Sequence, residues 1–157
     1  MREGRNWLHS ARRTQPITGA ARGGAHMAHI FFWAAAGVCA LTVFIHVFLG
    51  GAKWVRPFIA VEMEPGLKWL GYLMWHLGTV STLFLMAGFA AAAMDGSRTD
   101  YAMIATAGAA SFVAMAVWTA VKSSVPPQRF PVIFMFSVVT ALGVAGLLVE
   151  GALRPSA

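Results

Sequence analysis

Four long apolar runs constrain this chain more than any other feature of its sequence. They cover about residues 28–49, 67–94, 101–121 and 130–149. A helix needs about 20 residues to cross about 30 Å of hydrocarbon, and each run reaches that length. Membrane-spanning strands would instead show short segments of alternating polarity. The sequence therefore predicts an all-α membrane protein in which four transmembrane helices form an up-down bundle.

The composition excludes a water-soluble domain of this size. Hydrophobic residues make up 58% of the 157 residues and charged residues only 11%, whereas soluble domains carry about 25% charged residues. A short chain buries only about two-thirds of its surface on folding, so much apolar surface has to face lipid. The single cysteine, Cys39, excludes a disulfide framework. The lipid bilayer is therefore the first partner that the sequence predicts.

Residues 1–26 differ from the rest of the chain. They contain five arginines and one acidic residue, without apolar periodicity. Three interpretations remain open: a cytoplasmic arm drawn to anionic lipid, an organellar transit peptide, or a segment that is disordered or untranslated. The position of Met27, directly before the first apolar run, favours the last and leaves residues 27–157 as the four-helix transmembrane domain.

The same choice decides the predicted topology. One side of the membrane is expected to hold Lys53, Arg56, Lys68, Lys122 and Arg129. The other side holds seven arginines if the chain starts at Met1, but only two if it starts at Met27. Cytoplasmic loops carry the excess of Lys and Arg, so the shorter chain is expected to have both termini outside. The basic tail is too short and too poor in aromatic residues to predict nucleic-acid binding.

The stretch from Gly50 to Gly66 mixes apolar residues with lysine, arginine and glutamate. Its Trp54 and other apolar side chains can form one face, with the charged side chains beside it. We expect this stretch to lie in the membrane interface. An ordinary solvated loop is the alternative, because Pro57 interrupts any helix there.

Two histidines lie inside the predicted spans, where ionisable side chains are costly and need a reason. His46 is near the end of the first run and His76 is inside the second, so both are expected toward the same membrane surface. Each continues a polar stripe at helical spacing, which consists of Cys39, Thr42 and His46 on the first helix and of Tyr72, His76, Thr79 and Thr82 on the second. Such stripes point into a bundle.

Two interpretations of these stripes remain open. In the first, their side chains form interhelical hydrogen bonds that hold the first two helices together, at about 0.6 kcal/mol for each bond. In the second, they form a redox or ligand-binding site for a b-type haem, a metal ion or a quinone. The residues of that site would be His46 and His76, aided by Tyr72, Trp75 and Thr79.

No reaction can be named from the sequence. The spans contain no acidic residue apart from Glu150 at the end of the fourth, which disfavours a proton-coupled antiporter. No nucleotide-binding, hydrolase or zinc-protease motif is present. We therefore expect a non-enzymatic accessory or assembly subunit, bound to other membrane subunits, or a small homo-oligomer. A redox or ligand-binding protein is the first alternative, and an oligomeric small-molecule transporter is the second.

Four short motifs carry a resemblance: FIHVFLGG, RPF, MWHLGTVS and PPQRFPVIFMF. Their key residues are His46, Gly50, Gly51, Pro57, Trp75, His76, Pro127 and Gln128. In this combination the chain resembles an uncharacterised group of small bacterial inner-membrane proteins, with His-x-x-x-Gly-Gly ending helix one, Trp-His in helix two and Pro-Gln before helix four. The resemblance covers roughly residues 30–150. It implies a four-helix, multi-pass protein of the bacterial inner membrane and no particular activity.

Overall fold

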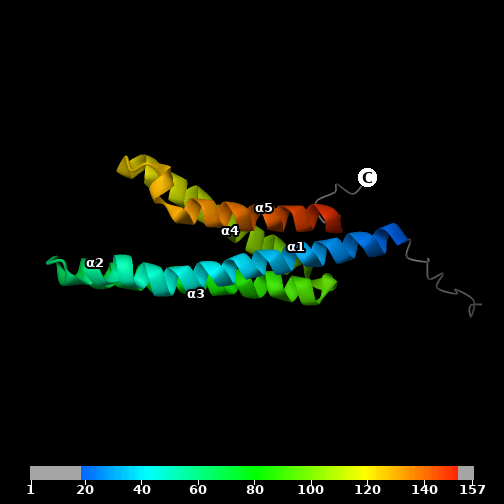
Figure 1. Cartoon of the computed structure of the whole chain (residues 1–157), viewed down its shortest axis with the longest axis horizontal. Coiled ribbons are helices and arrows are strands. Elements are labelled where there is room, and N and C mark those ends of the chain that lie inside the picture. The colour runs from blue at the N-terminus through cyan, green and yellow to red at the C-terminus, as the bar shows by residue number, and fades with distance from the viewer. Residues whose placement is uncertain (1–18, 152–157) are drawn as a thin grey trace, which may run out of the picture.

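The computed structural model describes residues 19–151, and for residues 19–23 and 25 it describes the backbone alone. Within this range the chain has four helices that are long and apolar enough to cross a membrane. These spans are His26–Ala60, Pro65–Met94, Gly96–Ser123 and Pro131–Glu150. Successive spans run in opposite directions and pack side by side (Figure 1), which confirms the all-α, four-helix architecture.

The first span differs from the prediction because its helix continues well past residue 49. α1 covers Gly19–Phe44, the π-helical segment η1 covers Ile45–Val55, and α2 covers Arg56–Ala60. Together they form one continuous helix (Figure 1). The stretch expected to lie in the interface or to form a loop is therefore helical as far as Ala60. Only residues 61–64 turn the chain into the second span.

The π-helical register explains why Pro57 does not end this helix. In an α-helix, proline lacks an N–H and its ring clashes with the carbonyl four residues earlier. In a π-helix each N–H bonds to the carbonyl five residues earlier, and the N–H of Arg56 donates in this way to the carbonyl of Gly51. Pro57 then stands in the first turn of α2, where its missing N–H costs little.

The start of the first helix also differs from the prediction. The chain is already helical at Gly19, well before the expected start near residue 28. Residues 19–26 of the basic segment are thus part of α1. Residues 1–18 of that segment lie outside the described residues.

The other three spans agree closely with their predicted ranges. α3 covers Pro65–Met94, η2 covers Gly96–Arg98 and α4 covers Thr99–Ser123, and η3 at Pro127–Arg129 precedes α5 at Pro131–Glu150.

The start of α3 is capped. The carboxylate of Glu64 accepts hydrogen bonds from the backbone N–H groups of Gly66 and Leu67, both at 2.8 Å. These two bonds lower the pKa of Glu64 from its usual value. The cap satisfies N–H groups that have no partner inside the helix, and it fixes the point at which the second span begins.

The buried core occupies one half of the bundle. Its largest fully buried side chains are Phe32, Phe89 and Val139. They are surrounded by small residues, mostly alanine, from about residues 28–39, 85–93, 102–109 and 136–147. In contrast, η1 and α2 contain no buried residue. The helices are thus packed tightly at the end that holds the α3–α4 turn and loosely at the opposite end.

Two glycines on α5 bring the aromatic core against the helix backbone. Phe32 lies against Gly146, and Phe89 lies against Gly143, so closely that a methyl group at either glycine would overlap its neighbours. The two phenylalanine rings stack with their centroids 6.5 Å apart. Helices in lipid have no hydrophobic driving force between them, so such close packing is what holds them together.

We predict that Gly146→Ala destabilises the protein by about 1–3 kcal/mol, the usual cost of overpacking a core, because the new methyl group overlaps the ring of Phe32. Gly37→Ala is the matched control, since a Cβ there meets nothing within 4 Å and alanine favours the helix. Thermal unfolding in detergent measures both variants. An unfolding temperature for Gly146→Ala at or above that of Gly37→Ala would contradict the packing described.

Candidate ligand-binding site

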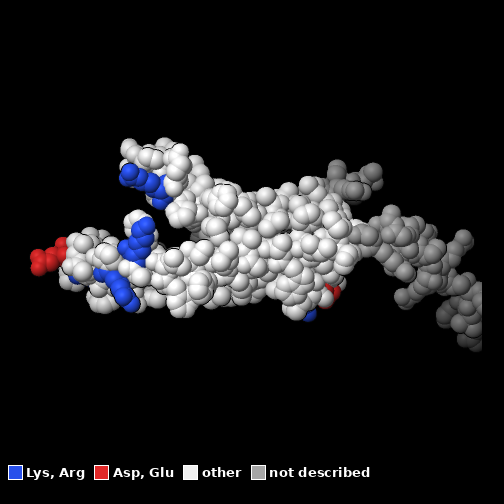
Figure 2. Space-filling view, viewed as in Figure 1, with Lys and Arg blue, Asp and Glu red and all other residues white. Residues whose placement is uncertain are grey.

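At the end opposite the core, the four helices separate into two pairs. The first pair is η1 and α2 with the start of α3, and the second is the end of α4 with the start of α5 (Figure 1). The surface is hollowed between the two pairs, and Lys and Arg side chains gather on both sides of the hollow (Figure 2).

A cleft of about 690 Å³ lies in this hollow. Small-molecule sites commonly measure about 300–1,000 Å³. We call it the His46 cleft, and its lining residues are Ile45, His46, Leu49, Gly50, Lys53 and Trp54 on η1, Trp75 on α3, and Val125, Arg129, Phe130, Pro131 and Val132 on the opposite wall. The cleft is therefore built by three parts of the chain that are far apart in sequence.

His46 and Trp75 form the centre of one wall. Their rings stack at a centroid distance of 3.7 Å and an interplanar angle of 14°. The Nε2 atom of His46 also lies 3.3 Å from the backbone carbonyl oxygen of Trp75, to which it donates as the Nε2–H tautomer. Stacking and hydrogen bonding together hold the imidazole in one orientation, across the interface between η1 and α3.

Gly50 makes room for this pair. A Cβ at Gly50 would lie 2.7 Å from Cη2 of Trp75, whereas a Cβ at the neighbouring Gly51 would meet nothing within 4 Å. The indole ring therefore lies directly on the backbone of η1. Only glycine allows an approach of this kind.

The mouth of the cleft is basic. Lys53 and Arg129 line it from opposite walls, and no acidic residue lines it. The ammonium group of Lys53 lies 5.7 Å from the ring centroid of Trp54. The cleft thus combines an apolar, aromatic interior with two positive charges.

The predicted polar stripes do not form the network of interhelical hydrogen bonds expected of them. The hydroxyl groups of Thr42, Thr79 and Thr82 donate to carbonyl oxygens of their own helices, at Val38, Trp75 and Gly78. Thr and Ser in helices often bond back in this way. Among the described residues of these stripes, the bond from His46 to Trp75 is the one that crosses between helices.

The predicted site residues fall into two groups. In the first group, the carbonyl oxygen of Trp75 accepts hydrogen bonds from His46 Nε2 and from the hydroxyl of Thr79. Tyr72 and His76 form a separate edge-to-face pair with centroids 4.5 Å apart. Tyr72 lines a smaller pocket of about 300 Å³, which shares Trp54 and Trp75 with the His46 cleft. His76 is exposed and lines neither cavity.

The two histidines do not fit a shared haem. Bis-histidine ligation needs one imidazole nitrogen on each side of the iron. The ring of His46 is stacked on Trp75 and its Nε2 is bonded to the Trp75 carbonyl, while His76 does not enter the cleft. Across residues 24 and 26–151, no group of three or more His, Cys, Asp or Glu side chains is placed to hold a metal ion.

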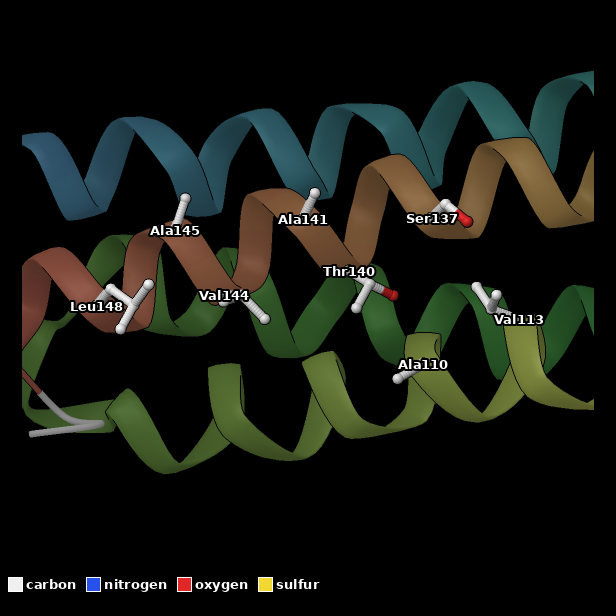
Figure 3. Close-up of a pocket in the computed structure, with 8 residues that line it drawn as sticks. All are labelled: Ala110, Val113, Ser137, Thr140, Ala141, Val144, Ala145 and Leu148. Atoms are coloured by element: carbon white, nitrogen blue, oxygen red, sulfur yellow. The ribbon is translucent and has the colours of Figure 1, made fainter.

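A second cavity, of about 590 Å³, lies on the outer face of α4 and α5 (Figure 3). Its lining is apolar or hydroxyl-bearing and consists of Ala110, Val113, Ser137, Thr140, Ala141, Val144, Ala145 and Leu148. The Thr140 hydroxyl donates to the Phe136 carbonyl of its own helix at 2.7 Å. This groove has no charged or aromatic lining residue, in contrast to the His46 cleft.

Sequence reasoning missed half of the cleft. The sequence predicted that Lys53 and Arg129 lie on one side of the membrane and that Phe130 begins the fourth span, but it did not place these three residues in a binding site. The available signal was that both basic residues were expected on the side of the membrane toward which His46 lies. Their position on opposite walls of one cleft depends on the continuous first helix.

No known protein family, curated protein or solved structure matches this chain.

We predict that Gly50→Ala destabilises the protein by about 1–3 kcal/mol, as overpacking does, and changes the emission of Trp75, because the methyl group pushes the indole off η1. Gly51→Ala has the same change in composition and helix propensity but no neighbour to displace. Thermal unfolding and tryptophan emission in detergent compare the two. Identical unfolding temperatures and spectra would show that Trp75 does not lie on Gly50.

Proposed function

We propose that this chain is a non-enzymatic, multi-pass protein of the bacterial inner membrane that binds one amphipathic ligand in the His46 cleft. The observation that carries the proposal is the combination of an aromatic interior and a basic mouth in a single cleft. This is the ligand-binding alternative of the sequence analysis, with His46 and Trp75 retained and His76 left outside the site.

The depth of the cleft supports an amphipathic ligand. α5 has 20 residues, and at 1.5 Å per residue it is about 30 Å long, which matches the hydrocarbon thickness. Its first residue, Pro131, therefore marks one boundary of the hydrocarbon. Phe130, Pro131 and Val132 all line the cleft. A ligand there would have its polar group among the lipid headgroups and its apolar part in the hydrocarbon.

The lining residues support binding rather than catalysis. Hydrolytic and transfer enzymes place a nucleophile and an acid or base within hydrogen-bond reach of each other. The lining of the cleft contains no Asp, Glu, Ser, Thr, Cys or Tyr, and the imidazole of His46 is already bonded through Nε2 to a backbone carbonyl. Aromatic and aliphatic side chains with a few polar groups are the usual lining of a binding pocket.

The test is to fill the cleft. We predict that Leu49→Trp lowers amphiphile binding at least tenfold, because Leu49 is an exposed lining residue of η1 whose replacement by indole occupies the cavity. Binding of phosphatidylglycerol, phosphatidylethanolamine and decylubiquinone to the detergent-purified full chain is measured by native mass spectrometry. At least one of the three is expected to bind at one molecule per chain.

The matched control is Leu148→Trp, the same exchange at an exposed lining residue of the groove on α4 and α5. It is expected to leave the 1:1 binding unchanged. Equal binding by both variants and the unsubstituted protein, or a loss only in Leu148→Trp, would refute a ligand site in the His46 cleft.

The charge distribution supports an orientation with the cleft toward the cytoplasm. The described Lys and Arg side chains at the cleft end are Lys53, Arg56, Lys68, Lys122 and Arg129. At the other end, the described basic side chain is Arg98, which pairs with Asp95 at 3.2 Å. Loops rich in Lys and Arg stay in the cytoplasm, so the cleft end belongs there in a chain that starts at Met27, whereas the five arginines of residues 1–26 would favour the opposite orientation.

We therefore predict that a cysteine at Gln128 is protected from an impermeant maleimide added to intact cells, and that a cysteine at Ser97 is labelled. Both residues are exposed, in η3 and η2, at opposite ends of the bundle. The variants carry Cys39→Ala, which removes the single native cysteine. Labelling at residue 128 but not at residue 97 would reverse the proposed orientation.

A further inference from the structure

We infer that the ligand of the His46 cleft is an anionic phospholipid, with its phosphate between Lys53 and Arg129 and an acyl chain against the aromatic wall. This inference rests on the proposed function and names the chemical class of the ligand. It is supported by charge complementarity, by the aromatic lining of the cleft and by its depth.

Charge complementarity is the first argument. Lys53 and Arg129 approach the cleft from opposite walls, and no carboxylate lines it to neutralise them. Both are exposed, so a ligand in the cleft can reach either charge. A phosphate diester suits this pair, because arginine binds phosphate oxygens bidentately and lysine binds them as a compact point charge.

The same argument disfavours the other amphiphiles of a bilayer. A zwitterionic headgroup would bring an ammonium group next to two cations, with no acidic side chain in the cleft lining to receive it. A quinone head is neutral and leaves both cations without a counter-charge. Like charges in close contact cost several kcal/mol at an interface. A headgroup with a net negative charge can instead pair with both cations at the mouth of the cleft.

The apolar part of the lipid has a matching surface. Trp54, Trp75 and Phe130 line the same cleft as the two cations, and tryptophan rings are enriched at the headgroup boundary of membranes. Leu49 and Val132 add aliphatic surface. A soluble phosphate ester would contact the basic mouth but none of these side chains, so the acyl chain is part of what the cleft recognises.

The test measures charge selectivity. With native mass spectrometry of the full chain in detergent, phosphatidylglycerol is expected to bind at least tenfold more tightly than phosphatidylethanolamine or decylubiquinone. Lys53→Gln combined with Arg129→Gln is expected to weaken phosphatidylglycerol binding about 25-fold. The loss of each basic group at a membrane surface lowers the affinity about fivefold, and the two losses multiply. The binding of the other two probes should not change.

The matched control removes one lysine and one arginine from the same end of the bundle. Arg56→Gln combined with Lys122→Gln alters two basic residues that do not line the cleft, and Lys122 lies instead over the ring of Trp118, 5.0 Å from its centroid. Phosphatidylglycerol binding is expected to stay within about twofold of the unsubstituted protein. An equal loss in both double variants would reduce the effect to the general surface charge and overturn the inference.

Three further outcomes separate this inference from the proposed function. If all three probes bind equally and Leu49→Trp abolishes their binding, the cleft is a ligand site but the anionic class is wrong. If glycerophosphate without acyl chains competes as well as phosphatidylglycerol, the ligand is a soluble phosphate and the lipid is excluded. If no probe depends on Leu49, both proposals fail.

Discussion

The close contact of Phe32 and Phe89 with two glycines of α5 is the interaction on which the shape of the bundle depends. In lipid, apolar side chains gain little by touching each other rather than acyl chains, so helix pairs are held by how closely their surfaces fit. Gly143 and Gly146 allow that fit at one end, where the buried alanines also lie. The opposite end has no comparable set of small residues between the two helix pairs, and there the pairs separate.

The first helix forms one wall of the cleft at the open end of the bundle. Because the π-helical register carries the chain past Pro57 without a break, η1 and α2 stay beside α3. Phe58 of α2 packs on Gly71 of α3, as Trp75 of α3 packs on Gly50 of η1. This keeps one wall of the cleft intact far beyond the core. Long π-helical segments are rare and often occur at functional sites, which agrees with the position of η1 along the His46 cleft.

Part of the candidate site followed from the sequence and part did not. The cost of ionisable groups in lipid singled out His46 and His76, and helical spacing joined Tyr72 and Thr79 to His76. The pairing of His46 with His76 was an inference from their common membrane surface, and in the structure the ring of His46 stacks on Trp75 while that of His76 contacts Tyr72. The roles expected of the threonines also failed, since a hydroxyl group satisfied by its own helix has no need of a neighbour.

The sequence by itself determined the four spans and their alternating direction. A helix needs about 20 apolar residues to cross a bilayer, and a charged side chain within the hydrocarbon is costly. It also predicted that Lys53 and Arg129 lie at the same end of the bundle. Only the tertiary structure decided that Lys53 and Arg129 face one cavity with His46 and Trp75 between them. That arrangement depends on where glycines let helices touch and where the helices diverge, and those are properties of packed surfaces that no single stretch of the chain contains.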